Sequence, residues 1–212
     1  EIAAVCDDEA LLVVVNHHAL GAALDGLDQP LLGLSFAAHG IDGVTLRDLA
    51  TVLGVSPMTP YRYFKDKDAI LAYVRARAFN RFAEAMENTK GAMLKKPGAW
   101  QPGEVYIDWA LKNPAAYRMI FDTNQPTAFD YPDLVAAMKR ARETMTLGWK
   151  VLREQGRFKG DVDLAGHLHW SAMHGAVMLE LTGLIKKPLD ARAIARRATA
   201  AIVKDLDVKP KD

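Results

Sequence analysis

Two short helices joined by a tight turn are encoded within residues 45–64, and this segment constrains the fold more than any other part of the chain. Thr45 and Asp48 have the three-residue spacing of a capping box, which marks the start of a helix. Apolar residues then recur at helical spacing, namely Leu46, Leu49, Ala50 and Leu53. The pattern predicts a short amphipathic helix that begins at residue 45.

The turn after this helix is short enough to fix how the two helices cross. Gly54 permits a sharp change of direction, and Val55 is placed to fill the joint between the helices. Ser56 predicts the cap of the second helix, with Pro57 at its first position. These features are those of a helix-turn-helix, whose second helix lies in the major groove of DNA.

The second helix is too short and too polar to be explained by burial alone. Its polar side chains have reach and can form hydrogen bonds: Thr59, Tyr61, Arg62 and Tyr63. Lys65 and Lys67 follow where a phosphate backbone would pass, whereas Phe64 is expected in the core. The segment therefore predicts double-stranded DNA as a partner.

The rest of the chain is also predicted to be helical. Only Leu11–Val15 has the β-branched density of a strand, so we expect an all-α protein with about nine helices. Helices are predicted at 30–40, 66–89, 104–112, from 114 onward, 132–156, from 161 or 163 to 186, and 188–207. Loops rich in Gly, Pro and Asp are predicted at 91–103 and 122–130.

Charge is distributed unevenly along the chain. Residues 1–46 hold seven acids and no Lys or Arg, whereas the remainder carries all 27 basic residues against 19 acids, a net charge of +8. We therefore expect an acidic leader at 1–28, whose order the sequence leaves open. A single cysteine, Cys6, and the lack of basic residues before the first apolar run favour a cytoplasmic protein. No stretch approaches the roughly 18 uninterrupted apolar residues of a membrane span, so none is expected.

Residues 37–71, AAHGIDGVTLRDLATVLGVSPMTPYRYFKDKDAIL, resemble the DNA-binding region of TetR-type transcriptional regulators. The resemblance implies a three-helix DNA-binding domain at 29–72, followed by an effector-binding and dimerisation domain at 73–212. It also implies DNA contacts from eight residues: Thr45, Arg47, Pro57, Met58, Thr59, Tyr61, Tyr63 and Lys67.

Two features depart from the family pattern. Pro60 stands where Leu is usual, so the second helix begins either at Pro57 or, with Thr59 as its cap, at Pro60. No basic residue precedes Arg47, and the net charge over 45–68 is only +1. Few phosphates would be neutralised, so we expect weak monomeric DNA binding that depends on a dimer reading two half-sites. The alternative is a helical small-molecule-binding protein whose DNA binding is weakened or lost.

The middle helices are rich in large aromatic and sulfur-containing side chains. Residues 106–121 and 170–183 resemble the ligand-binding region called WHG in one TetR subgroup. An apolar pocket with a few polar groups is expected for a small apolar or amphipathic effector. Its predicted lining is Tyr106, Trp109, Tyr117, Phe121, Met145, Trp149, His167, Trp170 and His174.

The last two helices carry apolar residues on more than one side, which is typical of a subunit contact. The resemblance implies a homodimer that forms through these helices and binds a palindromic operator. It also implies that the regulator is a repressor, which a small effector releases from DNA. His167, His169 and His174 lack the spacing of a metal site, and catalytic motifs are missing. We expect no metal, no cofactor and no enzymatic activity.

Overall fold

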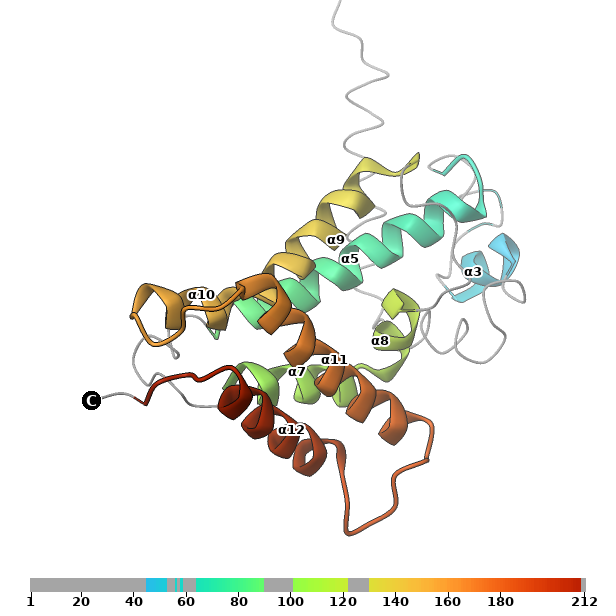
Figure 1. The fold of residues 1–212 in the computed structure, drawn as a ribbon. Helices are drawn as coiled ribbons and strands as arrows, with labels where there is room; N and C mark the ends of the chain where they lie inside the picture. The colour runs from blue at the N-terminus through green and yellow to red at the C-terminus, as the bar shows by residue number, and fades with distance from the viewer. Residues whose placement is uncertain are drawn as a thin grey trace, which may run out of the picture.

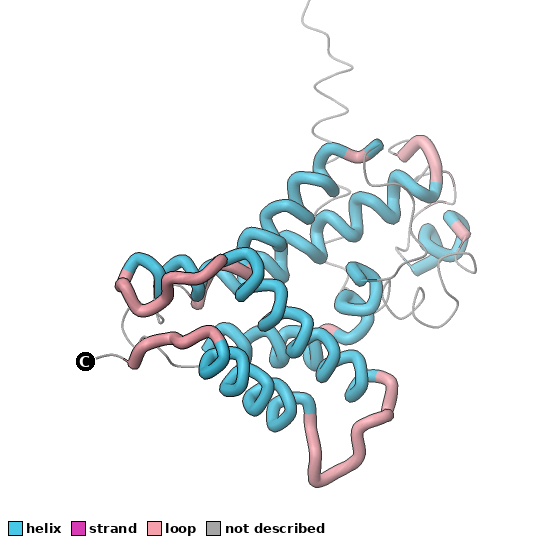
Figure 2. Tube along the Cα trace, viewed as in Figure 1, coloured by secondary structure: helices cyan, strands magenta, loops and turns pink. Residues whose placement is uncertain are grey.

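The computed structural model describes residues 45–52, 56, 58, 64–89, 101–121 and 130–210. These residues form eight α-helices, with loops and turns but no strand between them (Figure 2). The prediction of an all-α fold is confirmed. The predicted leader at 1–28 and the predicted helix at 30–40 lie outside the described residues.

Figure 1 shows how the eight described helices are arranged. Their bounds are α3 (Leu46–Val52), α5 (Lys67–Glu87), α7 (Gln101–Lys112), α8 (Pro114–Phe121), α9 (Pro132–Thr144), α10 (Leu147–Glu154), α11 (Val162–Leu181) and α12 (Ala191–Asp205).

Helix starts are set by the side chains that the sequence indicates. The hydroxyl of Thr45 donates to the Asp48 carboxylate at 2.6 Å, and the backbone N–H groups of both residues are bonded in return, which forms the predicted capping box. Asp66 caps α5 by accepting from the Ala69 N–H at 2.8 Å, and Asp161 caps α11 through two N–H groups. Ser56 Oγ accepts from the Met58 N–H at 3.4 Å, the contact expected of an N-cap.

The predicted continuous helix at 132–156 is wrong, because the structure divides it into α9 and α10 at Met145 and Thr146. The Thr144 hydroxyl bonds the Ala141 carbonyl and the Thr146 hydroxyl bonds the Glu143 carbonyl, so side chains take over backbone acceptors at this point. Helix α11 approaches the break at Gly166, where an added Cβ would stand 3.0 Å from Thr146. Tertiary packing thus fixes the break.

Other helix bounds differ by a few residues. Helix α7 begins at Gln101, three residues before the prediction, because Pro102 is acceptable in a first turn. Helix α11 ends at Leu181, and α12 begins at Ala191 behind the cap Asp190. At Asn113, between α7 and α8, the side-chain amide donates to the Trp109 carbonyl of α7 at 2.8 Å.

Two helix pairs frame the molecule. Helices α5 and α9 lie side by side and run in the same direction, since Tyr131 lies near Asp66 and Arg140 bonds Glu87 through two nitrogens at 2.8 and 2.6 Å. Helices α11 and α12 form the second pair, with α7 packed against both pairs (Figure 1). The main core fills the space between them, and a smaller apolar cluster around Trp149 and Phe158 joins α10 to the start of α11 and the end of α12.

Candidate functional site

The end of the molecule at α3 and the start of α5 carries the described residues predicted to contact DNA. Thr45 and Arg47 are exposed, Met58 is 67% exposed, and Lys67 is the half-exposed first residue of α5. Phe64 is buried and packs edge-to-face on Tyr73, as predicted for a core residue, and Ala50 is fully buried. Pro57, Thr59, Tyr61, Tyr63 and Pro60 lie outside the described residues.

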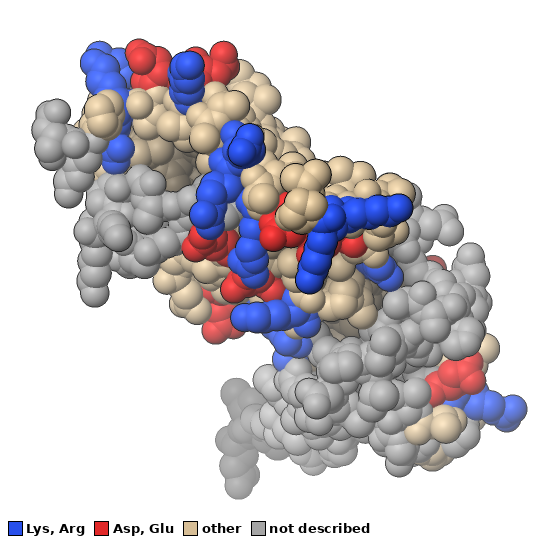
Figure 3. Space-filling model, turned by 90° about the horizontal axis from the view of Figure 1, so that it is seen from below, with Lys and Arg blue, Asp and Glu red and all other residues tan. Residues whose placement is uncertain are grey.

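Positive charge at this end is limited. The Lys65 ammonium lies 3.5 Å from the Asp66 carboxylate, and Asp68 is exposed in the first turn of α5. Elsewhere on the surface, basic and acidic side chains lie next to one another on the face shown in Figure 3. Ion pairs among the described residues include Arg196 with Glu104 at 2.7 Å and Arg192 with Asp108. Hydrogen bonding and charge from Arg192 and Lys112 hold the pKa of Asp108 below its usual range.

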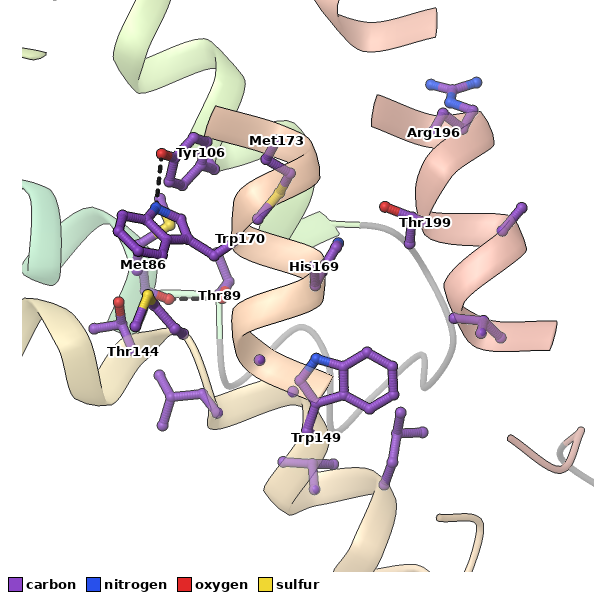
Figure 4. A pocket seen from close by; sticks show the side chains of 18 of the residues that line it. Met86, Thr89, Tyr106, Thr144, Trp149, His169, Trp170, Met173, Arg196 and Thr199 are labelled. Carbon is purple, nitrogen blue, oxygen red and sulfur yellow. Dashed lines mark hydrogen bonds between the residues drawn. The ribbon is translucent and has the colours of Figure 1, made fainter. Parts of the chain in front are cut away.

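A cavity of about 330 Å³ lies among α5, α7, α9, α10, α11 and α12 (Figure 4). Four of the nine predicted ligand residues line it: Tyr106, Met145, Trp149 and Trp170. Most of its remaining wall is apolar, with Phe82, Met86 and Met173 among the lining residues. This size and character are those of small-molecule sites in proteins.

A chain of hydrogen bonds begins at the cavity wall and passes into the core. The Trp170 indole N–H donates to the Tyr106 hydroxyl at 3.0 Å, which lies 2.6 Å from the Tyr117 hydroxyl. The Tyr117 hydroxyl lies 2.7 Å from His174 Nδ1. An indole nitrogen only donates, so with a neutral His174 the chain is satisfied when each tyrosine donates onward and Nδ1 accepts.

Burial determines the protonation states of the side chains in this series of hydrogen bonds. Desolvation raises the pKa of Tyr106 and of Tyr117 far above the ordinary value, so both hydroxyls keep their protons. Desolvation lowers the pKa of His174, which favours the neutral imidazole that can accept from Tyr117. The four side chains therefore form an uncharged relay that joins α7, α8 and α11.

The other predicted ligand residues lie outside the cavity wall. Tyr117, Phe121 and His174 pack together behind Trp170, with the Phe121 and His174 ring centroids 4.7 Å apart. Trp109 packs edge-to-face on Phe82, on the core side of α7. His167 Nδ1 lies 2.7 Å from the Asp163 carbonyl in the first turns of α11.

His169 lines the cavity and was not among the residues predicted from sequence. It lies four residues after buried Ala165 and four before buried Met173, so helical spacing was the signal that could have found it. Burial lowers the pKa of its imidazole to about 4. Its Nε2 atom is buried and has no hydrogen-bond partner among the described residues, and the Trp149 ring meets the imidazole edge-to-face at 6.2 Å.

Two family models match separate parts of the chain. Residues 35–74 match "Bacterial regulatory proteins, tetR family", and residues 101–202 match "Tetracyclin repressor-like, C-terminal domain". The two matches together cover 142 of the 212 residues. The chain belongs to the TetR family.

Relatives of this TetR-family protein are distant in sequence. The HTH-type transcriptional regulator Rv1816 of Mycobacterium tuberculosis is 23% identical over 177 residues, which covers 68% of this chain and 75% of that protein. Among solved structures, a protein of unknown function from Rhodococcus sp. RHA1 has a TM-score of 0.67 at 20% identity and covers 82% of this chain and 91% of its own. The TetR family transcriptional regulator PfmR from Thermus thermophilus has a TM-score of 0.57 at 19% identity, with 85% and 97% covered.

Membership identifies the chain as a helix-turn-helix transcriptional regulator of the TetR family rather than an enzyme. The matched N-terminal segment spans α3 and the start of α5, and the matched C-terminal segment spans α7 to α11 and most of α12. Within the described ranges, no helix is long and apolar enough to cross a membrane. The same residues contain no cluster of three metal-ligating side chains.

Proposed function

We propose that this TetR-family protein is a ligand-responsive repressor whose homodimer binds a palindromic operator and releases it when a small effector enters the cavity. The observation that carries the proposal is the course of α5. This helix has 21 residues, about 30 Å of length, and it begins with Lys67 at the DNA-facing end. Its other end supplies Phe82 and Met86 to the cavity wall. One rigid element therefore touches both predicted sites.

Effector control requires that the ligand bind one arrangement of the helices more tightly than the other. A ligand that moves the cavity end of α5 by a small amount also moves its DNA-facing end, and in a dimer this changes the separation of the two reading heads. A coupling of about 1–3 kcal/mol would weaken operator binding roughly 5- to 150-fold.

Dimerisation is supported by an exposed stripe along α11. The stripe consists of Leu164, Leu168, Ser171, Gly175 and Leu179, which lie within an arc of about 80° at 100° per residue. Leu164, Leu168 and Leu179 are 54%, 39% and 43% exposed, and an added Cβ at Gly175 meets no atom within 4 Å. Leucines around a glycine form a surface on which a second helix can approach closely.

Gly175→Arg is expected to weaken the dimer at least tenfold and to leave the protomer folded. The site is open in the protomer, and glycine in a helix interior is itself unfavourable, so the new side chain is tolerated until a partner approaches. Light scattering coupled to gel filtration measures the change over a concentration series, with circular dichroism as the check on folding. Val135→Arg, at an exposed apolar position on α9, is the control and should stay dimeric. Dimerisation of Gly175→Arg at wild-type strength would remove the α11 stripe from the interface.

DNA binding is tested on a duplex selected by the protein from a random pool. We expect a palindromic sequence, and a loss of about tenfold in affinity for Lys67→Ala and for Tyr61→Ala, measured by fluorescence anisotropy. Four basic residues lie in 45–68, so a dimer neutralises about eight phosphates at most, and the slope of log K against log salt should not be steeper than about −7.

The control for this experiment is Lys204→Ala, at an exposed position near the end of α12, which should bind as the wild type does.

The low charge near α3 and α5 favours one second candidate, a helical small-molecule sensor that has lost DNA binding. Failure to select any duplex, together with unchanged weak binding in Lys67→Ala and Tyr61→Ala, would support that candidate and overturn the repressor.

A further inference from the structure

The cavity contains a buried polar atom with which no described residue pairs. His169 Nε2 is the buried side-chain atom without a hydrogen-bond partner among the described residues that line the cavity. Its imidazole projects from α11 into the region between Trp149 and α12 (Figure 4). Buried polar groups are nearly always satisfied, so an unpaired atom at a cavity wall indicates a partner that occupies the cavity.

Several other polar groups of the wall already have partners inside the protein. The Thr89 hydroxyl donates to the Met86 carbonyl at 2.6 Å, and the Thr144 hydroxyl donates to the Ala141 carbonyl at 2.6 Å. Tyr106 is bonded to Trp170 and Tyr117 within the relay. These groups do not need a ligand to be satisfied, which sets His169 apart from them.

The charges of the described part of the wall disfavour an ionic ligand. Arg196 is its only charged residue, and the guanidinium is paired with Glu104 of α7 at 2.7 Å. Burial lowers the pKa of His169 to about 4, so the imidazole is neutral at physiological pH. An ammonium group would enter this wall without a counter-charge, and a carboxylate would have to compete with Glu104 for Arg196. Burying a charge that lacks a partner is strongly unfavourable.

Resting on the proposed function, we infer that the effector is an uncharged, mostly apolar molecule, and that its single hydroxyl-type group is bound by His169 Nε2. A hydroxyl both donates and accepts, so it satisfies Nε2 in either tautomer of the neutral ring. The aromatic and methionine side chains of the wall, Phe82, Met86, Trp149, Trp170 and Met173 among them, would contact the apolar body of the ligand.

Three probes with the same biphenyl body and different polar groups test this assignment: 4-phenylphenol, 4-methylbiphenyl and biphenyl-4-carboxylate. Calorimetry on the full chain at pH 7.5 should give about 5- to 10-fold tighter binding for the phenol than for the methyl analogue. The carboxylate should bind about 100-fold more weakly than the phenol. In His169→Phe the preference for the phenol over the methyl analogue should disappear, and in His169→Gln, which keeps a polar group, part of it should remain.

Each result bears on the assignment separately from the proposed function. An undiminished phenol preference in His169→Phe, or a carboxylate that binds most tightly, would overturn the assignment while leaving a working effector cavity. Binding of the probes without any effect on the affinity for the selected duplex would count against effector control but not against His169. If none of the three probes binds the wild type, while thermal melting shows it folded, an apolar effector of this class is excluded. Leu147→Trp, which places a larger side chain in the same wall, should weaken all three probes together if they occupy the cavity.

Discussion

Tyr117→Phe is expected to lower the free energy of unfolding by about 2–4 kcal/mol, although it removes only one oxygen atom. The Tyr117 side chain is fully buried, and its hydroxyl bridges Tyr106 at 2.6 Å and His174 at 2.7 Å. Without that oxygen, the buried Tyr106 hydroxyl loses its acceptor and His174 Nδ1 loses its donor. The cost of two stranded partners exceeds the net value of an ordinary hydrogen bond, which is about 1 kcal/mol.

Urea unfolding at pH 7.5 measures this difference, and a decrease of about 5–15 °C in Tm should accompany it for a domain of this size. Tyr73→Phe is the matched control, because among the described residues the Tyr73 hydroxyl has one long hydrogen bond, 3.4 Å from Arg77 one turn along α5. It should cost less than about 1 kcal/mol.

The double variant Tyr106→Phe/Tyr117→Phe distinguishes a relay from two independent hydroxyls. Once Tyr106 has lost its own hydroxyl, removal of the Tyr117 oxygen strands fewer partners, so the two costs should not add. A double-variant cost equal to the sum of the single costs, or a Tyr117→Phe variant within about 0.5 kcal/mol of wild type, would contradict the relay.

The parts of the fold that were predicted correctly depend on interactions between residues close in sequence. The Thr45–Asp48 box and the Asp66 cap are local, so the spacing of residue types was sufficient to find them. The break between α9 and α10 is not local in origin. It depends on the approach of α11 at Gly166, twenty residues from Thr146, and the apolar spacing within 132–156 does not indicate that approach.

The cavity wall was predicted incompletely for a similar reason. Aromatic residues on the middle helices identified the region, but they did not distinguish the residues that face the cavity from those, such as Tyr117 and Phe121, that pack behind it. His167 and His169 differ by two residues and therefore by about 200° around α11, so only the rotation of the helix within the fold decides which of them is in the cavity. That rotation is set by packing against α7, α10 and α12.

The stability of the protein is expected to depend on pH through His169. Burial lowers its folded-state pKa to about 4, against about 6.5 in an unfolded chain, so between these values the unfolded state binds more protons. Stability is therefore fully present above a pH of about 6.5 and is lost as the pH falls toward 4. The contribution of this one group to the loss is about 3 kcal/mol by pH 4.

Other groups change stability in the same direction, so the comparison must be between variants. His174 also has a lowered pKa through burial, and hydrogen bonding to Arg140 lowers the pKa of Glu87, so both lose stabilisation as the pH falls. Arg196 is the one charged residue among the described residues of the cavity wall, and its charge does not change over this range.

Urea unfolding of wild type and His169→Phe at pH 7.5, 6, 5 and 4 isolates the contribution of His169. The free-energy difference between the two proteins should shift by about 3 kcal/mol in favour of the variant as the pH falls, because the variant has no imidazole to protonate. Met173→Leu alters the packing of the same wall without removing a titratable group, and its pH profile should run parallel to that of the wild type. Parallel profiles for wild type and His169→Phe would mean that water reaches the imidazole as freely in the folded protein as in the unfolded chain, and the cavity would then not be the dry, apolar site that an uncharged effector requires.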